Sequence, residues 1–406
     1  MPPFKPQDAF YSAYDSHLLD TCPDISSLTP PWENCNVVSP YKIVLPQGVI
    51  DRVEQAVANI FGLSRADAYR KALLETGADR QVLLGPAKNL SVLMSYDFHL
   101  DREGKPRLLE INTNAAGFLL ADAIYQVHSE PGPFPGAANA LKNSFFEEFD
   151  RTGLGNSPHI AIIDEAPWGH KMFPEFLLYK SLFESWGCTC TIHDYKDLVL
   201  RKGALWSVAE GQEKRIDFIY NRYCDFTLAD PTSKKLREAY LNSACTFSPN
   251  PREYFLLADK RRLVQFSKLG WLETVAPSDV SIEAVRKVLV PTWDKTGFED
   301  INEIWEKRKQ LFFKPPQSYA GKNAYRGASI TRKVFNRVLE QGTLIQQYVP
   351  APVIQFENDE SETHWKYDLR AYAYGGEVQL LVARIYQGQI TNFNQVYGGY
   401  CPVFVL

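Results

Sequence analysis

The alternation of apolar and polar positions along the chain predicts a mixture of helices and strands. Apolar residues recur at helical spacing through 47–63 and again through 64–77, and we expect a helix in each. Ser64 and Asp67 have the spacing of a capping box at the start of the second helix. Residues 1–45 are rich in proline and aromatic side chains and show no period, so we expect an arm lying along the body. Further helices are expected at 117–128, 137–149 and 333–341.

A β-α-β alternation begins at His159. Alternation of this kind implies a parallel sheet with right-handed crossovers, and ligands of such sheets sit beyond the carboxyl ends of the strands. The loops at those ends hold Trp168, His170 and Arg222, which are therefore candidates to contact a substrate. A packed loop and a surface arginine explain the same residues equally well. The strands are expected at 160–163, 189–192 and 216–220, with a helix at 173–186.

Residues 90–114 predict a β-hairpin, because two apolar-rich runs flank the turn sequence R-E-G-K-P. A turn centred on Glu103 and Gly104 places Asp97 directly opposite Glu110, with Asn112 on the same face. Facing carboxylates repel each other, and a hard divalent cation such as Mg²⁺ would relieve that repulsion. An ordinary solvent-facing hairpin is the alternative.

The segment 311–327 reads L-F-F-K-P-P-Q-S-Y-A-G-K-N-A-Y-R-G. Its apolar run predicts a buried strand that stops at Pro315, because proline cannot donate to the ladder. The loop that follows combines glycines with basic side chains, as a polyphosphate site needs, although a surface turn with solvated lysines fits as well. It is not a Walker A loop. The residues concerned are Ser318, Gly321, Lys322, Arg326 and Gly327.

Two strands are expected near the C-terminus, at 366–376 and 378–386, joined by a hairpin turn. Asp368 and Arg370 share one face of the first strand, and Arg384 interrupts the apolar run of the second. A charged residue there is costly unless it is paired or functional, so Arg384 is the residue that packing explains least.

Two further stretches carry candidate chemistry. The strand expected at 344–350 would offer backbone groups at its edge to an adenine ring. A helix opening near Leu256 carries the run Asp259-Lys260-Arg261-Arg262, and most charge runs of this kind are solvated faces.

Composition and charge exclude several classes of function. The formal net charge of -4 gives no basic footprint for nucleic acid or for a membrane surface. We find no signal peptide and no apolar run near the ~20 residues of a membrane span, so we expect a cytoplasmic protein. The seven cysteines are scattered, and Cys188-x-Cys190 lacks the partner pair of a zinc site, so reduced thiols are expected.

Together these stretches resemble an ATP-grasp enzyme over 90–114 and 159–394. Most ATP-grasp enzymes carry an E-x-N metal motif near the end of the chain, whereas Glu110-Ile111-Asn112 lies far upstream. That order resembles the circularly permuted branch, which contains glutathionylspermidine synthetase. The resemblance implies an α/β (α+β) ATP-grasp fold with a permuted metal hairpin and a small parallel-sheet domain before the grasp. The domains would be 1–152 with the arm, helices and hairpin, 153–250 on the substrate side, and 251–406 with the nucleotide-binding subdomains.

The resemblance also assigns roles to the residues that match the family's motifs. Lys260 and Lys314 would reach the nucleotide phosphates, and the loop from Ser318 to Gly327 would cover them as a lid. Arg370 and Arg384 would stabilise the transferring phosphoryl group; the arginine that the branch carries two residues before the metal-binding Asp is Ser95 here. Ligands of Mg²⁺ would be Asp97, Glu110 and Asn112. ATP contacts are implied for Lys260, Lys314, Ser318, Gly321, Lys322, Gln346, Gln347, Tyr348 and Val349.

Enzymes of this superfamily join a carboxylate to an amine through an acyl phosphate, with ATP and Mg²⁺. The resemblance therefore implies small-molecule acid and amine substrates, amino-acid-like or peptide-like, with His170 and Arg222 as substrate contacts and no nucleic acid or membrane partner. A kinase that stops at the phosphorylated product and a nucleotide-binding protein without catalysis are the alternatives. A homodimer is the general expectation for oligomeric state.

Overall fold

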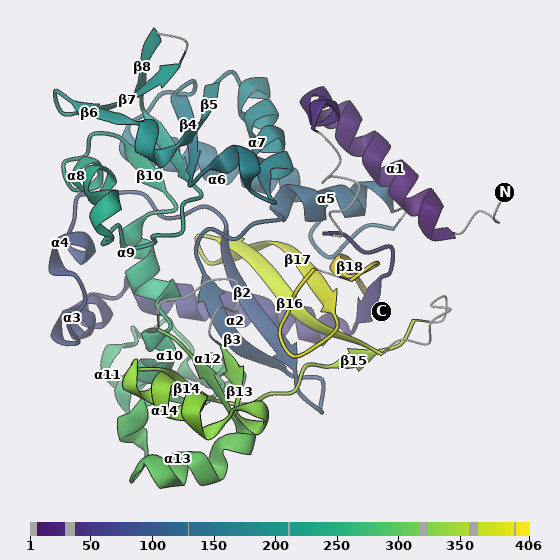
Figure 1. Ribbon diagram of the computed structural model, residues 1–406, viewed down its shortest axis with the longest axis vertical. Coiled ribbons are helices and arrows are strands. Elements are labelled where there is room, and N and C mark those ends of the chain that lie inside the picture. The colour runs from purple at the N-terminus through teal and green to yellow at the C-terminus, as the bar shows by residue number, and fades with distance from the viewer. Residues whose placement is uncertain are drawn as a thin grey trace.

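The structure is a computed structural model that describes residues 6–28, 37–128, 130–209, 212–316, 324–356, 364–393 and 395–406. These residues form a mixed α/β structure with four sheets. Figure 1 shows three groups of elements one above another: a teal group at the top, a large sheet in the middle and a green group at the bottom. No helix of the described residues is long and apolar enough to cross a membrane.

The large central sheet joins strands from both ends of the chain. The C-terminal hairpin predicted from the sequence forms, and it turns at Gly375 and Gly376, which both have positive φ. Within this sheet, adjacent strands run antiparallel, except that the short strand β1 (Ile43–Leu45) runs parallel to β18 (Gly399–Val405). The order is β1 (Ile43–Leu45), β18 (Gly399–Val405), β17 (Glu377–Tyr386), β16 (Trp365–Tyr374), β2 (Met94–Leu100) and β3 (Pro106–Asn112), with β15 (Val353–Ile354) paired to β16.

Helices pack on both faces of the central sheet. On one face, Leu369 and Ala371 of β16 belong to a core shared with Val53 and Val57 of α2 (Gln47–Arg65). Tyr372 points the other way, into a second core shared with α5 (Phe118–Val127) and α6 (Ala137–Thr152). Strand alternation places Asp368 and Arg370 on this second face.

The upper group contains the predicted parallel sheet, in the order β10-β9-β4-β5. The β-α-β interpretation from His159 onward is therefore confirmed. A small antiparallel sheet inserted before β9 was not predicted. The strands of the parallel sheet are β4 (His159–Asp164), β5 (Thr189–Asp194), β9 (Phe218–Asn221) and β10 (Thr246–Ser248), with helices α7 (Phe173–Ser185) and α8 (Lys234–Leu241); the inserted strands are β6 (Val199–Arg201), β7 (Ala204–Ala209) and β8 (Gln212–Ile216).

The lower group is an antiparallel sheet with its own core of Phe313, Ile345, Ile304 and Phe335. Its strand order is β11-β14-β12-β13, so β14 lies between two neighbours and is not the free edge expected from the sequence. The strands are β11 (Thr292–Trp293), β12 (Leu311–Lys314), β13 (Tyr325–Arg326) and β14 (Leu344–Gln347), and the helices are α10 (Arg261–Ser267), α11 (Trp271–Val275), α12 (Ile282–Val288), α13 (Ile301–Lys307) and α14 (Arg332–Glu340).

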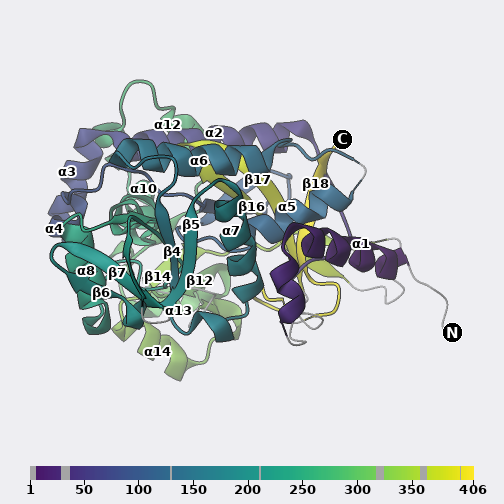
Figure 2. The same cartoon turned by 90° about the horizontal axis from the view of Figure 1, so that it is seen from above.

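Two expectations for the N-terminal region were wrong. The expected arm contains a helix, α1 (Pro6–Thr21), which lies beside α5 (Figure 2) and donates a hydrogen bond from Tyr14 Oη to Leu120 O at 3.0 Å. Ser64 is not a cap: it lies in the last turn of α2, and its hydroxyl donates to Phe61 O. The remaining helices are α3 (Asp67–Glu75), α4 (Arg80–Leu83) and α9 (Pro251–Glu253).

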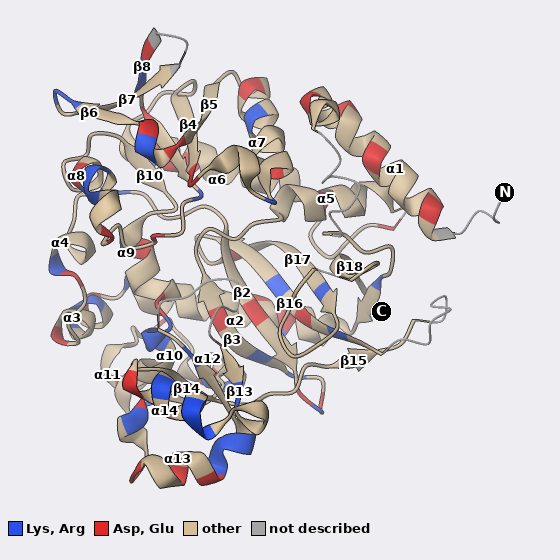
Figure 3. Cartoon of the chain, viewed as in Figure 1, with Lys and Arg blue, Asp and Glu red and all other residues tan. Residues whose placement is uncertain are grey.

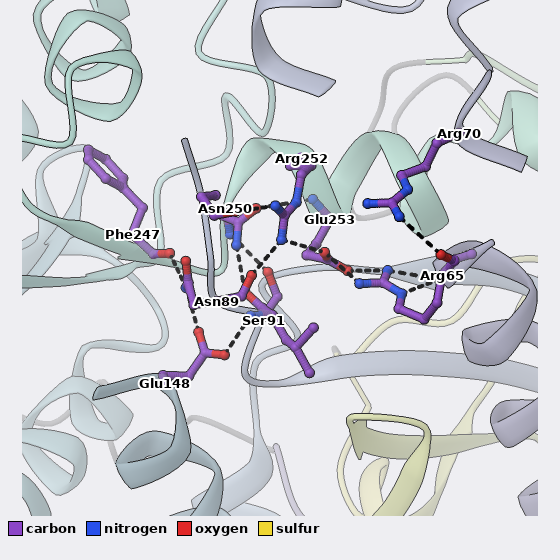
Figure 4. Close-up of polar contacts among 12 residues, drawn as sticks. Arg65, Arg70, Asn89, Ser91, Glu148, Phe247, Asn250, Arg252 and Glu253 are labelled. Carbon is purple, nitrogen blue, oxygen red and sulfur yellow. Dashed lines mark hydrogen bonds and ion pairs between the residues drawn. The ribbon is translucent and has the colours of Figure 1, made fainter. Parts of the chain in front are cut away.

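A buried polar network joins α2, α6 and the linker after β10 (Figure 4). Asn89 Nδ2 donates to Glu148 Oε2 at 2.6 Å and to Phe247 O at 2.9 Å. The carboxylate of Glu253 is almost fully buried and receives two hydrogen bonds from Arg65, at 2.9 and 2.6 Å. Charged groups buried in this way hold one geometry, because any other leaves them unpaired. The network therefore fixes the linker on the central part.

Replacing Arg65 with alanine is expected to lower the free energy of unfolding by about 3 kcal/mol, because Glu253 would lose its bidentate partner while staying buried. Arg70 provides the matched control: it pairs with Asp67 at the surface, at 2.7 Å. Arg70→Ala should cost at most about 1 kcal/mol. Urea unfolding of both variants measures the difference, and equal costs would refute the structural role of the Arg65–Glu253 pair.

Candidate active site

The hairpin of β2 and β3 places Asp97 directly opposite Glu110, as predicted, but by a different route. Close to the turn the strands are out of the predicted register by one residue, because Leu100 pairs with Pro106. A bulge between Asp97 and Phe98 then adds one residue to β3 and restores the register. The two departures cancel, so the facing carboxylates were predicted correctly.

The bulge also exposes a backbone carbonyl to the lower sheet. Leu109 is the extra residue, and its oxygen accepts hydrogen bonds from Lys314 Nζ at 3.1 Å and from Gln346 Nε2 at 3.2 Å. Lys314 ends β12 and Gln346 lies on β14, so both candidate nucleotide contacts reach the central sheet at this carbonyl. The bulge thus connects the two sheets at the candidate site.

Asp97 is the centre of an ion network on the α5–α6 face of the central sheet. Its carboxylate accepts from Arg370 Nε and Nη2, both at 2.8 Å, from Arg384 Nη2 at 3.0 Å and from Asn112 Nδ2 at 3.1 Å. Burial alone would raise the pKa of Asp97, but the two guanidinium groups lower it to about 2. Asp97 is therefore ionised at any physiological pH and holds both arginines in place.

Arg384 bridges two carboxylates, which explains a charge inside an apolar strand. Its Nε donates to Asp368 Oδ1 at 2.7 Å and its Nη2 to Asp368 Oδ2 at 3.0 Å, in addition to the bond to Asp97. Thr391 Oγ1 donates to Asp368 at 2.6 Å and orients it. Among the described residues, Arg370 and Arg384 donate only from Nε and Nη2, so the Nη1 group of each is left for a ligand.

Two lysines approach Glu110 from the lower group. Lys260 Nζ lies 3.7 Å from Glu110 Oε2. Burial would raise the pKa of Glu110, but Lys260 and Lys314 together hold it below its usual range. Burial lowers the pKa of Lys314 despite the nearby carboxylates.

The charges of the cluster do not cancel. Within the part of the chain that the structure describes, the cluster has four cations, Arg370, Arg384, Lys260 and Lys314, and three carboxylates, Asp97, Glu110 and Asp368, so one positive charge is in excess. Basic side chains also gather on α14 and after α13 in the lower group (Figure 3). This distribution attracts an anion to the boundary between the two sheets.

The residues at the hairpin fit a divalent cation only in part. Both carboxylate oxygens of Asp97 accept hydrogen bonds from arginine. Among the described residues, no three His, Cys, Asp or Glu side chains lie together as a metal-binding group. Glu110 and the Oδ1 of Asn112 remain, since Asn112 uses its Nδ2 on Asp97. Two oxygen ligands suit Mg²⁺, which commonly completes its shell with water and phosphate oxygens. The structure thus brings the predicted trio together but favours Asp97 as their positioning residue.

In the segment predicted to bind adenine, 344–350, several backbone groups already form hydrogen bonds within the protein. Gln347 N donates to Pro291 O and Tyr348 N to Gln310 O, both at 2.8 Å, while Val349 O lies 2.8 Å from His99 Nδ1. The rings offer a surface instead: Tyr348 stacks on Phe312 with centroids 6.5 Å apart. The remaining predicted loop contacts, Ser318, Gly321 and Lys322, lie outside the described residues.

Three residues of the charge run 259–262 are buried rather than solvated, contrary to the sequence interpretation: Asp259, Lys260 and Arg262. Asp259 accepts from the backbone N of Arg261 at 3.0 Å and from its Nε at 2.9 Å. A π-helical turn, Tyr254–Ala258, precedes the run, and α10 begins only at Arg261. Lys260 is thereby held at a helix start that faces Glu110, which no local charge pattern could reveal.

The candidate substrate residues lie at the carboxyl ends of β4 and β9, as expected. Arg222 is buried, not a surface residue; its Nη1 donates to Ala115 O at 3.4 Å, and its Nε has no partner among the described residues. Asp164 and His170 lie close enough to interact with it electrostatically. Burial raises the pKa of Asp164 and lowers that of His170. A buried arginine with an unused donor is suited to an anionic ligand.

The loop between β3 and α5 connects the two clusters. Ala116 O accepts from Tyr372 Oη at 2.7 Å and from Tyr400 Oη at 2.8 Å, next to Arg370. The preceding residue, Ala115, contacts Arg222. Sequence reasoning missed both tyrosines, His99 and Thr391; for Tyr372 a signal existed, because it shares a strand face with Arg370.

Replacing Gly117 with alanine is expected to destabilise this loop. A Cβ there would lie 2.1 Å from Tyr400 Cζ, and the residue has φ +91°. Gly136 is a matched control, with φ +86° and open space around it. Gly136→Ala should cost about 1–2 kcal/mol for the backbone alone, and Gly117→Ala at least about 2 kcal/mol more. Thermal unfolding compares them, and equal melting temperatures would contradict the close packing on Tyr400.

No family model and no curated protein matches this sequence. Solved structures do match. A glutathione synthetase-like effector from Globodera pallida, in its apo form, aligns over 91% of this chain and 90% of its own, with a TM-score of 0.57 and 13% identity. A provisionally named gamma-glutamylcysteine synthetase from Methylobacillus flagellatus aligns over 90% of each chain, with a TM-score of 0.48 and 9% identity. The effector shows that the fold is shared across nearly the whole chain.

Proposed function

We propose that this protein is an ATP- and Mg²⁺-dependent carboxylate–amine ligase of the circularly permuted ATP-grasp type. The observation that carries the proposal is the convergence of Arg370, Arg384, Lys260 and Lys314 on the hairpin carboxylates, with one positive charge in excess. The effector that shares the fold is named for glutathione synthetase, which supports the same class of reaction. The domain boundaries 1–152, 153–250 and 251–406 are part of this proposal.

Each cation has a place in phosphate binding. Lys260 and Lys314 would hold the phosphates of ATP, and the unused Nη1 groups of Arg370 and Arg384 would contact the transferring phosphoryl group. Asp97 is a positioning residue that fixes both guanidinium planes. Glu110 and Asn112 would hold Mg²⁺, which supplies charge neutralisation at the phosphates when bound.

The adenine would lie against the lower sheet. Phe312 and Tyr348 supply rings there, and Gln346 lies opposite Phe312 on β14, followed along the chain by Gln347 and Val349. Ser318, Gly321 and Lys322 would close over the phosphates and keep water from the reacting group.

The acid substrate would bind between Arg222 and Arg370. Its carboxylate oxygen attacks the γ-phosphorus of ATP, ADP leaves, and an acyl phosphate forms. The amine nitrogen then attacks the acyl carbon, phosphate leaves with one oxygen of the original carboxylate, and the nitrogen loses a proton. Arg222 and His170 would hold a second anionic group of the acid, as an amino acid or peptide would carry.

The test is turnover of ATP with Mg²⁺ against pools of amino acids and dipeptides, with ADP, AMP and phosphate measured separately. We expect ADP and phosphate in equal amounts, and only when an acid and an amine are both present. A stable phosphorylated acid without an amine requirement would identify a kinase. Tight ATP binding without any product would identify a nucleotide-binding protein, and AMP with pyrophosphate would refute the acyl-phosphate route.

A further inference from the structure

A cavity of about 220 Å³ lies on the central sheet away from the candidate active site. Its walls are one side of α5 with Asp122, Tyr125 and Gln126, the loop 131–136, and Leu380–Leu381 of β17. Leu380 precedes Arg384 by four residues on the same strand, which corresponds to about 13 Å along β17. The cavity is therefore separate from the phosphate cluster.

The residues around this cavity include several acceptors. Three residues of the loop, Pro131, Pro133 and Pro135, have a backbone carbonyl but no N–H. The hydroxyl of Tyr125 is already used, since it donates to Leu381 O at 2.6 Å and accepts from Val403 N at 2.8 Å. Asp122 adds a carboxyl group. The carboxyl group of Asp122 suits a ligand that carries donors of its own.

Aromatic rings complete the walls. Tyr125 is fixed by its hydroxyl bonds, and the loop packs tightly on its ring, because a Cβ at Gly132 would lie 2.5 Å from Tyr125 Cε1. Phe134 lines the cavity from the loop side. Ring faces attract cations, and a carboxylate beside them supplies a counter-charge.

Asp122 is half-buried, and burial raises its pKa to about 6, with Gln126 as the hydrogen-bond partner that opposes the shift. The lining residues from the loop and from β17 carry no charge. A bound cation would remove the cost of the desolvated carboxylate.

We propose that this cavity binds an alkylammonium group, from a free amine or from a lysine side chain, with Asp122 as its counter-ion and the rings of Tyr125 and Phe134 as its walls. The site is additional to the amine-binding step of the proposed ligase, because the cavity and the phosphate cluster share no residue. It would let the protein respond to an amine without consuming it.

The test is calorimetric titration of the full chain with n-butylammonium, with 1-butanol as its uncharged isostere, and with Nα-acetyl-lysine amide. We expect butylammonium to bind at least tenfold more tightly than butanol. Asp122→Asn should weaken amine binding at least tenfold, whereas Asp150→Asn, an exposed acid on α6, should not change it. Tighter binding of the lysine derivative would assign the site to a protein side chain, and tighter binding of butylammonium would assign it to a free amine.

A second variant, at Phe134, keeps the proposal testable if Asp122→Asn does not fold. Phe134→Leu keeps an apolar wall but removes the ring, so it should weaken butylammonium several-fold and leave butanol unchanged. Glu110→Gln should retain amine binding here even if ligase activity is lost, which separates this proposal from the proposed function. Equal binding of amine and alcohol, unchanged binding by Asp122→Asn, or no binding of either amine would overturn it.

Discussion

Replacing Arg384 with alanine is expected to lower the free energy of unfolding by about 3–5 kcal/mol. Among the described residues, the substitution leaves Asp97 with one arginine and Asp368 with Thr391 as its one side-chain hydrogen-bond partner, and both carboxylates are buried. Breaking a buried ion pair by removing one partner is strongly destabilising, because the remaining charge stays desolvated. Urea unfolding followed by circular dichroism measures the loss.

The control for Arg384 is an arginine outside the network. Arg102 is exposed in the turn of the β2–β3 hairpin, and Arg102→Ala should change stability by less than about 0.5 kcal/mol. If Arg384→Ala is as stable as the wild type, the network does not hold the carboxylates as described. Because the variant is expected to be unstable, loss of its activity alone would not identify Arg384 as catalytic.

Replacing Glu110 with glutamine is the cleaner probe of the chemistry, and turnover should fall at least about a hundredfold. The amide keeps the size of the side chain but removes the charge that faces Lys260 and that would hold Mg²⁺. Glu110→Gln also removes a counter-charge of the buried Lys260 and Lys314, so we expect some loss of stability, and urea unfolding of the variant confirms that the assay uses folded protein. Steady-state turnover across a Mg²⁺ titration measures the effect, and the loss should shrink as Mg²⁺ is raised.

The matched control is Glu103→Gln, an exposed glutamate in the turn of the same hairpin. It should leave turnover unchanged. If Glu110→Gln keeps an activity within twofold of the wild type, Glu110 is not a ligand of Mg²⁺.

Local patterns predicted much of this fold. The C-terminal hairpin, the parallel sheet from His159 and most helices form where periodicity placed them. The periodicity was uninformative for α1, which is held by contacts such as Tyr14 to Leu120 rather than by a clear amphipathic stripe. The inserted sheet β6-β7-β8 was missed because its strands lack a buried apolar run: β6 is largely exposed, and β8 has the sequence Q-E-K-R-I.

The parts of the candidate site that lie on one strand or within one hairpin were predictable, and the contacts between distant segments were not. Arg384 stood out because a charge in an apolar strand needs a partner, and the structure supplies Asp368 and Asp97. The facing of Asp97 and Glu110 followed from strand alternation, although a bulge was needed to keep it. Contacts such as Lys314 to Leu109 O join residues far apart in the chain, and no local pattern encodes them.

The measurement that tests the central claim most directly follows ¹⁸O from the acid substrate into phosphate. The acid that supports turnover in the pooled assay is labelled in its carboxylate and incubated with ATP, Mg²⁺ and the amine. An acyl-phosphate ligase predicts one ¹⁸O atom in the released phosphate for each amide formed. Unlabelled phosphate, or label in AMP, would contradict the account.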